Sequence, residues 1–275
     1  IDLRTTAAGE IMVCLVINAD GLPGGRAAEA RLVDCLLAEQ PRTVSVLLNI
    51  NRKNTNVVLG EQYRKLYGSG WIEDTLCGLR FRLSAGSFYQ VNREGAELLY
   101  ETAARMAEVR GGESLWDLYC GAGTIGLSML SPGRNARPAQ VTGVEIVPEA
   151  VACAEQNARL NAEAGRIPPD AAHFFCADAG DAAALFAAAD TGAAPAPDIV
   201  IIDPPRKGTT PELIRELARR GVSRVVYVSC DPETLARDCA LFRASGYAVG
   251  EVQPVDMFPR TGHVEAVVLM SREDK

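Results

Sequence analysis

A cysteine between a predicted strand and a predicted helix is the residue best suited to nucleophilic chemistry. The apolar, β-branched run 225–228 has the length of a buried strand and ends at Ser229-Cys230. A helix start follows at once, because Asp231 is a typical N-cap and Pro232 suits the first helical position. The strand-to-helix turn places Cys230 at the mouth of a candidate active site, where the positive end of the helix favours a thiolate. A small buried cysteine is the alternative.

A glycine-rich turn earlier in the chain has the features of a nucleotide-type binding loop. The strand candidate 115–119 continues into the letters CGAGTIG at 120–126, which match G-x-G-x-x-G and open a predicted helix. Gly121 and Gly123 let the backbone approach a ligand, and the helix start offers free N–H groups. Glu145, at the end of the next strand candidate, can accept hydrogen bonds from ribose hydroxyls. The pattern fits NAD and S-adenosylmethionine equally.

Two further acidic residues are placed where they could act on a substrate. The apolar run 199–202 leads into the letters DPPRKG at 203–208, whose prolines fix the loop backbone and can hold Asp203 against a planar substrate. Dehydrogenases have no need of such a loop. Glu265 opens the apolar run 266–270, where an acid is costly to bury without a purpose.

Regular alternation of strands and helices from residue 115 onward predicts how these residues are positioned. We expect helices between successive strands, and a parallel sheet of βαβ units, with strands near 115–119, 140–145, 172–176, 198–202, 224–229, 247–253 and 263–270. Ligands of such sheets bind at the carboxyl ends of the strands. Glu145, Asp203 and Cys230 all fall there.

The first 85 residues lack this regular alternation, and their mixture of one helix with short strands predicts a small α+β domain. A helix over 27–39 ends before Pro41, and strands are expected at 10–17, 44–50, 57–59, 63–67 and 79–83. Residues 86–275 form the second domain, which a helix over 93–109 opens. The basic pairs in the first domain, at 52–53 and 64–65, are typical of a solvated surface.

Composition places the 275-residue chain among ordinary globular proteins, with 48% hydrophobic and 23% charged residues. No uninterrupted apolar run reaches the roughly 18 residues of a membrane helix. Eight cysteines without a C-x-x-C pair, with only two histidines, argue against a metal site and for a reducing cytoplasm. The net charge of −7 argues against nucleic acid as a partner, although a local basic patch is compatible with it.

Taken together, these stretches resemble one family, the RNA uracil-5-methyltransferases, which make 5-methyluridine in tRNA and ribosomal RNA. The resemblance covers essentially all of residues 86–270 and rests on five motifs in family order: FYQVN at 88–92, DLYCGAG at 117–123, DPPRKG at 203–208, SCDPETLARD at 229–238 and DMFPRTGHVE at 256–265. It implies an α/β, Rossmann-like methyltransferase fold dependent on S-adenosylmethionine. Its mostly parallel seven-stranded sheet has an antiparallel last strand and accompanies the smaller α+β domain.

The resemblance also implies roles for individual residues. Cys230 matches the nucleophile and Glu265 the general base, whereas Asp203, Pro204 and Arg206 match positions that contact the target base. The positions that hold S-adenosylmethionine or shape its pocket are Gln90, Tyr119, Gly121, Gly123, Glu145, Asp178 and Asp203. Thr124 is a departure, because some members carry Asn there.

Many members of this family begin with an OB-like RNA-binding domain, in some cases with a four-cysteine iron–sulfur site. This sequence begins at Ile1 and contains neither, so we expect a trimmed catalytic part.

The chemistry of uracil explains why this residue set is needed. Attack of a thiolate at C6 makes C5 nucleophilic, and a base must then remove the proton from C5. We predict methyl transfer from S-adenosylmethionine to C5 of a uridine in structured RNA, with ribosomal RNA favoured over tRNA.

Three alternatives remain open at this point: an RNA cytosine-5 methyltransferase, a non-catalytic relative that only binds cofactor or RNA, and an NAD-dependent oxidoreductase. Cytosine-5 RNA enzymes that resemble this class carry a second cysteine in the D-x-P loop, which is missing here. An ionised Asp203 would accept a hydrogen bond from N3–H of uracil and repel N3 of cytosine.

Overall fold

The computed structural model describes residues 1–54 and 57–272, which divide into two compact units. Unit 1 comprises residues 1–75 and 80–89, and unit 2 comprises residues 76–79 and the chain from residue 90 onward. The division thus falls four residues beyond the boundary predicted after residue 85, and residues 76–79 group with unit 2. That the units are separate domains stays a prediction.

Unit 1 is built on a sheet in the order β1-β2-β3-β4, whose strands are β1 (Asp2–Thr5), β2 (Ile11–Ile17), β3 (Thr43–Ile50) and β4 (Gln62–Gly68). The neighbours β2 and β3 are parallel and are joined by helix α1 (Gly25–Glu39), whereas the other pairs are antiparallel. Val13, Val33 and Val46 form the centre of the packing between α1 and this sheet. A second sheet pairs β5 (Trp71–Leu76) with β6 (Leu79–Ser84).

The strand predicted over residues 57–59 is wrong. These residues belong to the loop between β3 and β4, and Val57 and Val58 leave their side chains 62% and 69% exposed. Their carbonyl oxygens accept hydrogen bonds from the Asn51 side-chain amide, where a strand would bond to a neighbouring backbone. Strands β1 and β5 were not predicted.

Unit 2 contains a sheet with the order β12-β13-β11-β10-β7-β8-β9 and, within the described residues, seven strands. The strands are β7 (Ser114–Leu118), β8 (Gln140–Glu145), β9 (Ala172–Cys176), β10 (Ile199–Ile202), β11 (Arg224–Ser229), β12 (Ala248–Val255) and β13 (Glu265–Ser271). Among these strands β13 alone runs opposite to the direction of the others, and it pairs antiparallel with both β11 and β12. The predicted fold class, a mostly parallel sheet with an antiparallel last strand, is confirmed.

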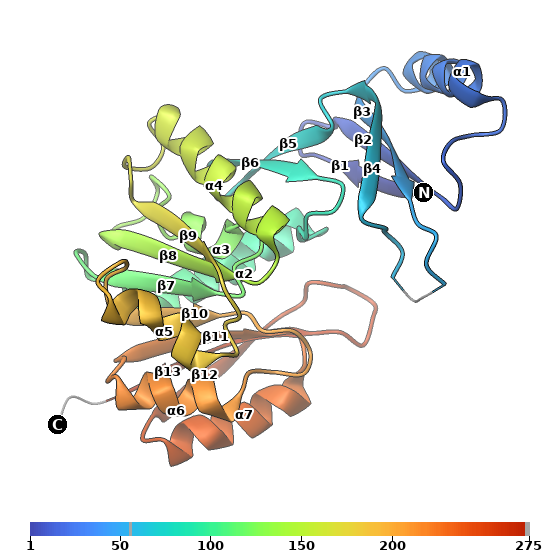
Figure 1. Cartoon of the computed structure of the whole chain (residues 1–275). Coiled ribbons are helices and arrows are strands. Elements are labelled where there is room, and N and C mark those ends of the chain that lie inside the picture. The colour runs from blue at the N-terminus through green and yellow to red at the C-terminus, as the bar shows by residue number, and fades with distance from the viewer. Residues whose placement is uncertain (55–56, 273–275) are drawn as a thin grey trace. The chain divides into compact units, whose positions relative to one another are not determined.

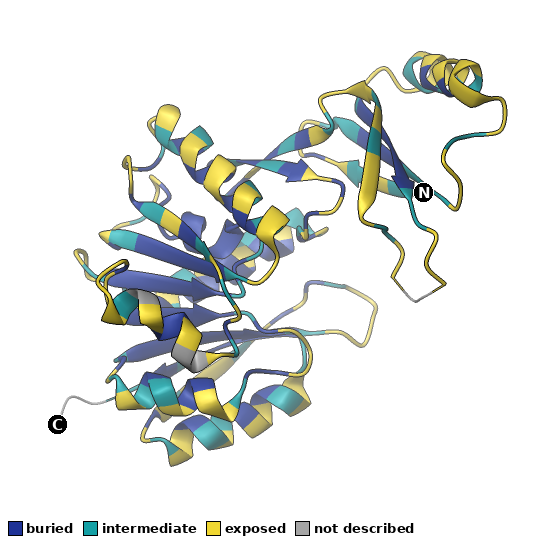
Figure 2. Cartoon of the chain, viewed as in Figure 1, coloured by how far each residue is buried: buried dark blue, intermediate teal, exposed yellow. Residues whose placement is uncertain are grey.

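Helices cover the sheet of unit 2 (Figure 1). They are α2 (Arg93–Ala107), α3 (Thr124–Ser128), α4 (Pro148–Glu163), α5 (Ala182–Asp190), α6 (Pro211–Arg219) and α7 (Pro232–Ala244). Helices α5, α6 and α7 bury Phe186, Leu213 and Phe242 in one cluster with Trp116 and Tyr227 of the strands. Figure 2 shows the central strands dark blue along most of their length, whereas the outer faces of the helices are yellow. No helix in the described ranges is long and apolar enough to cross a membrane.

Candidate active site

The strand order of unit 2 brings the predicted site residues to one edge of the sheet. Parallel β10 lies between β7 and β11, with Ile202 opposite both Leu118 and Tyr227, so that the residues after these strands emerge together. Antiparallel β13 enters from the same edge, and its Ala266 pairs with Ser229 at the end of β11. This register places Glu265, the first residue of β13, beside Cys230, the first residue after β11.

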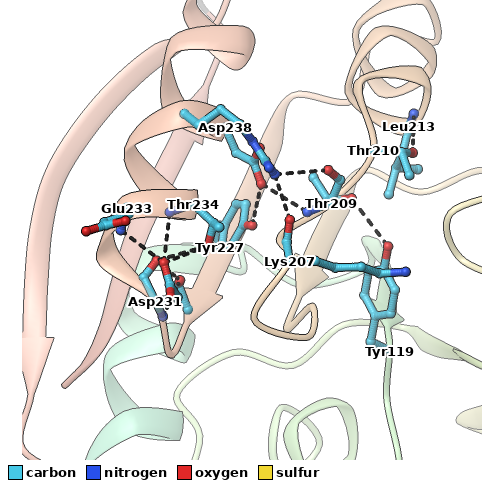
Figure 3. Close-up of polar contacts among 12 residues, drawn as sticks. Tyr119, Lys207, Thr209, Thr210, Leu213, Tyr227, Asp231, Glu233, Thr234 and Asp238 are labelled. Atoms are coloured by element: carbon cyan, nitrogen blue, oxygen red, sulfur yellow. Dashed lines mark hydrogen bonds and ion pairs between the residues drawn. The ribbon is translucent and has the colours of Figure 1, made fainter. Parts of the chain in front are cut away.

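The turn after β11 has the local structure that its sequence predicts. Asp231 caps α7 by accepting hydrogen bonds from the backbone N–H groups of Glu233 (3.1 Å) and Thr234 (2.9 Å), as Figure 3 shows. Pro232 occupies the first turn of the helix. These backbone bonds, with Thr234 first, lower the pKa of Asp231. Cys230 is half-buried immediately before this cap.

The surroundings of Cys230 oppose the thiolate that the helix start favours. Burial raises the pKa of this thiol, and the carboxyl groups of Glu265 and Asp203 raise it further, whereas the Arg206 guanidinium opposes them. Glu265 is 6% exposed, and burial likewise raises its pKa against the opposing effect of Arg206. These shifts show that Cys230, Glu265, Asp203 and Arg206 share one electrostatic environment.

The surroundings of Asp203 oppose the ionised form on which the expected uracil contact depends. Burial, followed by the nearby Glu265 and Asp117 carboxyls, raises the pKa of Asp203 to about 8. Its side chain is therefore mostly protonated at pH 7 in the free chain, and a protonated carboxyl both donates and accepts hydrogen bonds. Charge on Asp203 alone does not separate uracil from cytosine.

The loop after β10 exposes its middle and buries its ends. Pro204 is buried, residues 205–207 including Arg206 are exposed, and Gly208 is buried with a φ of +74°. The Gly208 N–H donates to the carbonyl of Pro205 at 2.8 Å and closes a tight turn. Arg206 thus reaches solvent from a loop that is fixed on both sides.

The glycine-rich turn after β7 leaves open space at the predicted position. Gly121 has a φ of +54°, and a Cβ added to it would meet nothing within 4 Å among the described atoms. The Gly121 N–H donates to Glu145 Oε2 at 3.1 Å, and the Val147 N–H donates to Glu145 Oε1 at 2.9 Å. Each carboxylate oxygen still has capacity for another donor. The predicted helix that follows is α3, which has five residues.

The remaining predicted cofactor positions differ in their surroundings. Gln90 is 9% exposed, so its amide is largely withdrawn from solvent. Tyr119 has a φ of +64°, and its hydroxyl lies 3.3 Å from Thr209 Oγ1. Asp178 is exposed and accepts a hydrogen bond from the Gly180 N–H at 2.8 Å. The hydroxyl of Thr124, the position that departs from the family pattern, is already bonded to Tyr100 at 2.9 Å.

Two buried acids at this edge have no role in the sequence argument. Asp117 accepts a hydrogen bond from the Gly126 N–H through Oδ2 at 2.7 Å, whereas its buried Oδ1 has no partner among the described residues. Burial raises the pKa of Asp117 to about 7. Asp238, in α7, is fully buried and hydrogen-bonded. In the sequence, Asp117 and Asp238 could have been noticed as acids within apolar segments. Only the fold shows which groups each of them contacts.

The fold and this edge together define a Rossmann-like methyltransferase. A family model described as tRNA (uracil-5-)-methyltransferase matches residues 1–273, and the chain belongs to that family. An RNA methyltransferase of Halalkalibacterium halodurans is 39% identical over 95% of this chain, and one of Clostridium acetobutylicum is 40% identical over 97%. These matches cover 53% and 54% of the two relatives, so the chain spans about half their length.

A solved structure supports the same assignment. The tRNA (uracil-54, C5)-methyltransferase of Pyrococcus abyssi, determined with S-adenosyl-L-homocysteine, matches 98% of this chain with a TM-score of 0.74 and 28% sequence identity. The match covers 58% of that protein.

Proposed function

We propose that this chain is the catalytic part of an enzyme that transfers a methyl group from S-adenosylmethionine to C5 of a uridine in RNA. The observation that carries the proposal is the register of β11 and β13, which sets Cys230 beside Glu265. The family and the Pyrococcus neighbour support the same chemistry. An oxidoreductase would leave this pair without a role.

The residues at the carboxyl edge fit S-adenosylmethionine. The open space over Gly121 admits a ligand close to the backbone, and Glu145 retains acceptor capacity for ribose hydroxyls. The buried Oδ1 of Asp117, which has no partner among the described residues, offers a polar group that a ligand can satisfy. When bound, this cofactor supplies an electrophilic methyl group.

In the proposed mechanism Cys230 acts as the nucleophile and Glu265 acts as the base. The Cys230 thiolate forms a bond to C6 of uracil, and the electron pair of the C5–C6 double bond moves towards the C4 carbonyl as an enolate. C5 then bonds to the methyl group, and the electron pair of the broken S–CH3 bond leaves with S-adenosylhomocysteine. Glu265 then removes the proton from C5, the double bond re-forms, and the thiolate leaves C6. A raised pKa strengthens Glu265 as a base, and Arg206 counteracts the raised pKa of the thiol.

Two features of the substrate remain predictions. We predict ribosomal RNA as the substrate, whereas the family description and the Pyrococcus neighbour name tRNA, so both classes belong in an assay. Uracil is preferred over cytosine because the loop at 203–206 lacks a second cysteine.

All eight cysteines lie in the described chain as free thiols, which suits a reducing cytoplasm.

The test is the intact mass of the protein after incubation with S-adenosylmethionine and RNAs that carry 5-fluorouridine. Fluorine replaces the proton that Glu265 must remove, so the enzyme should stall as a covalent adduct of RNA plus methyl. The adduct should vanish in Cys230→Ala and persist in Cys239→Ala, a half-buried thiol further along α7. An adduct that survives in Cys230→Ala, or one that forms only with 5-fluorocytidine, would reject the proposal.

A further inference from the structure

Asp238 is a carboxylate that the proposed chemistry does not use, although its surroundings are specific. It is 0% exposed in α7, and its Oδ2 accepts hydrogen bonds from the Tyr227 hydroxyl at 2.7 Å and the Thr209 N–H at 3.0 Å. Its Oδ1 accepts from Arg237 Nε at 2.8 Å. Figure 3 shows Asp238 between Tyr227 and Thr209. A buried carboxylate is tolerated only when it is paired in this way.

The partners of Asp238 lie on three separate elements. Tyr227 belongs to β11, the strand that ends at Cys230, and Thr209 belongs to the loop that carries Asp203 and Arg206. Asp238 itself lies two turns into α7, the helix that starts directly after Cys230. One side chain therefore joins both sides of the cysteine turn to the loop opposite it.

Arg237 strengthens the same connection. Its Nη2 donates to the carbonyl of Lys207 at 2.9 Å and lies 3.5 Å from that of Thr209. Gly208 lies between Lys207 and Thr209 in the loop. It packs closely against α7, because an added Cβ would fall 2.4 Å from Arg237 Nη2 and 2.5 Å from Asp238 Oδ2. Three consecutive loop residues are thus held by two consecutive residues of α7.

The held segment begins immediately after Arg206. We propose that Asp238, with Arg237, is a positioning residue that holds the loop at 207–209 so that the Arg206 guanidinium faces Cys230. The proposal rests on the proposed function of Cys230 and explains how its environment is set. Asp238 is not a catalytic residue, because it is fully buried behind the loop.

The consequence is measurable at the thiol. Cys230 faces Glu265 from β13 and Asp203 and Arg206 from the loop after β10, and of these Arg206 alone favours the thiolate. If the loop loosens, the cation moves away while the carboxyls remain. The thiol should then ionise at a higher pH.

The experiment is the rate of iodoacetamide alkylation of Cys230 between pH 6 and 10, followed by mass spectrometry of the peptide that contains it. In Asp238→Asn and in Arg237→Ala, whose side chain is 50% exposed, we expect this rate at pH 7.5 to fall about three- to tenfold. The affinity for S-adenosylhomocysteine should stay within twofold. Arg243→Ala, on an exposed position of the same helix, is the matched control and should leave the rate unchanged.

A double variant tests the route through Arg206. Arg206→Ala should produce the same loss, and adding Asp238→Asn to it should produce no further loss, because both remove one interaction. An unchanged profile in folded Arg237→Ala and Asp238→Asn would overturn the proposal, as would losses that add. A shifted profile without a 5-fluorouridine adduct in the unsubstituted protein would instead reject the proposed function and leave the positioning role standing.

Discussion

Carboxyl groups with raised pKa values distinguish the candidate site from the rest of unit 2. Asp117, Asp203 and Glu265 are each shifted upward chiefly by burial, and Asp203 is also shifted by the other two. Sequence reasoning placed Asp203 and Glu265 at this edge but could not assign their protonation. That property depends on how much water the folded chain leaves around each acid.

The raised pKa of Asp203 predicts how stability depends on pH. The unfolded chain releases this proton near the ordinary value of 3.8, whereas the folded chain keeps it up to about 8. The folded state therefore binds more protons in this range, and the free energy of unfolding falls as pH rises from about 4 to about 8. Asp203→Asn cannot titrate, so at pH 8 it should be more stable than the unsubstituted protein, by on the order of 1–4 kcal/mol.

Urea unfolding at pH 5, 6, 7 and 8 measures this difference. Its size should grow steadily with pH, whereas Asp256→Asn, at an exposed position before the last strand, should give no such trend. A constant difference between the curves across this range would show that Asp203 titrates normally.

At the scale of elements, strands with long apolar runs were predictable and those without them were not. The run at 225–228 is buried on both faces of the sheet and read clearly as a strand. Strand β5 interrupts its apolar residues with Glu73 and Asp74, and β1 has only four residues, so neither stood out. The apolar residues 57–59 were wrongly predicted as a strand, because the Asn51 side chain donates hydrogen bonds to the carbonyls of Val57 and Val58 in a loop.

Gly143 of strand β8 allows Phe174 of β9 and Cys120 of the glycine-rich turn to pack closely against β8. A Cβ at Gly143 would lie 2.3 Å from Phe174 Cδ1 of β9 and 3.0 Å from Cys120 Sγ. Gly143→Ala should therefore destabilise unit 2 by about 1–3 kcal/mol, since a packed core resists an added methyl group.

Gly133→Ala is the matched control for this prediction. Nothing described lies within 4 Å of a Cβ at that position, so its free energy of unfolding should stay near that of the unsubstituted protein. Adding Phe174→Leu to Gly143→Ala should restore part of the loss. Equal urea midpoints for the two alanine variants would contradict the packing argument.

At the scale of the whole molecule, ligand binding should stabilise unit 2 through the edge that the strand order creates. A ligand that binds only the folded state adds about 2.7 kcal/mol at one hundred times its dissociation constant. For a unit of this size, that gain raises the melting temperature by about 5–10 °C. S-adenosylhomocysteine should produce this shift in a thermal melt, and NAD should not.

A pair of acid variants connects the shift to the site. Glu145→Ala removes the carboxylate that meets the glycine-rich turn, so the shift caused by S-adenosylhomocysteine should shrink to less than half. Glu149→Ala, at an exposed position in the first turn of α4, should keep the full shift. Stabilisation by NAD in place of S-adenosylhomocysteine would mean that the glycine-rich turn serves a different nucleotide and that Cys230 needs another explanation.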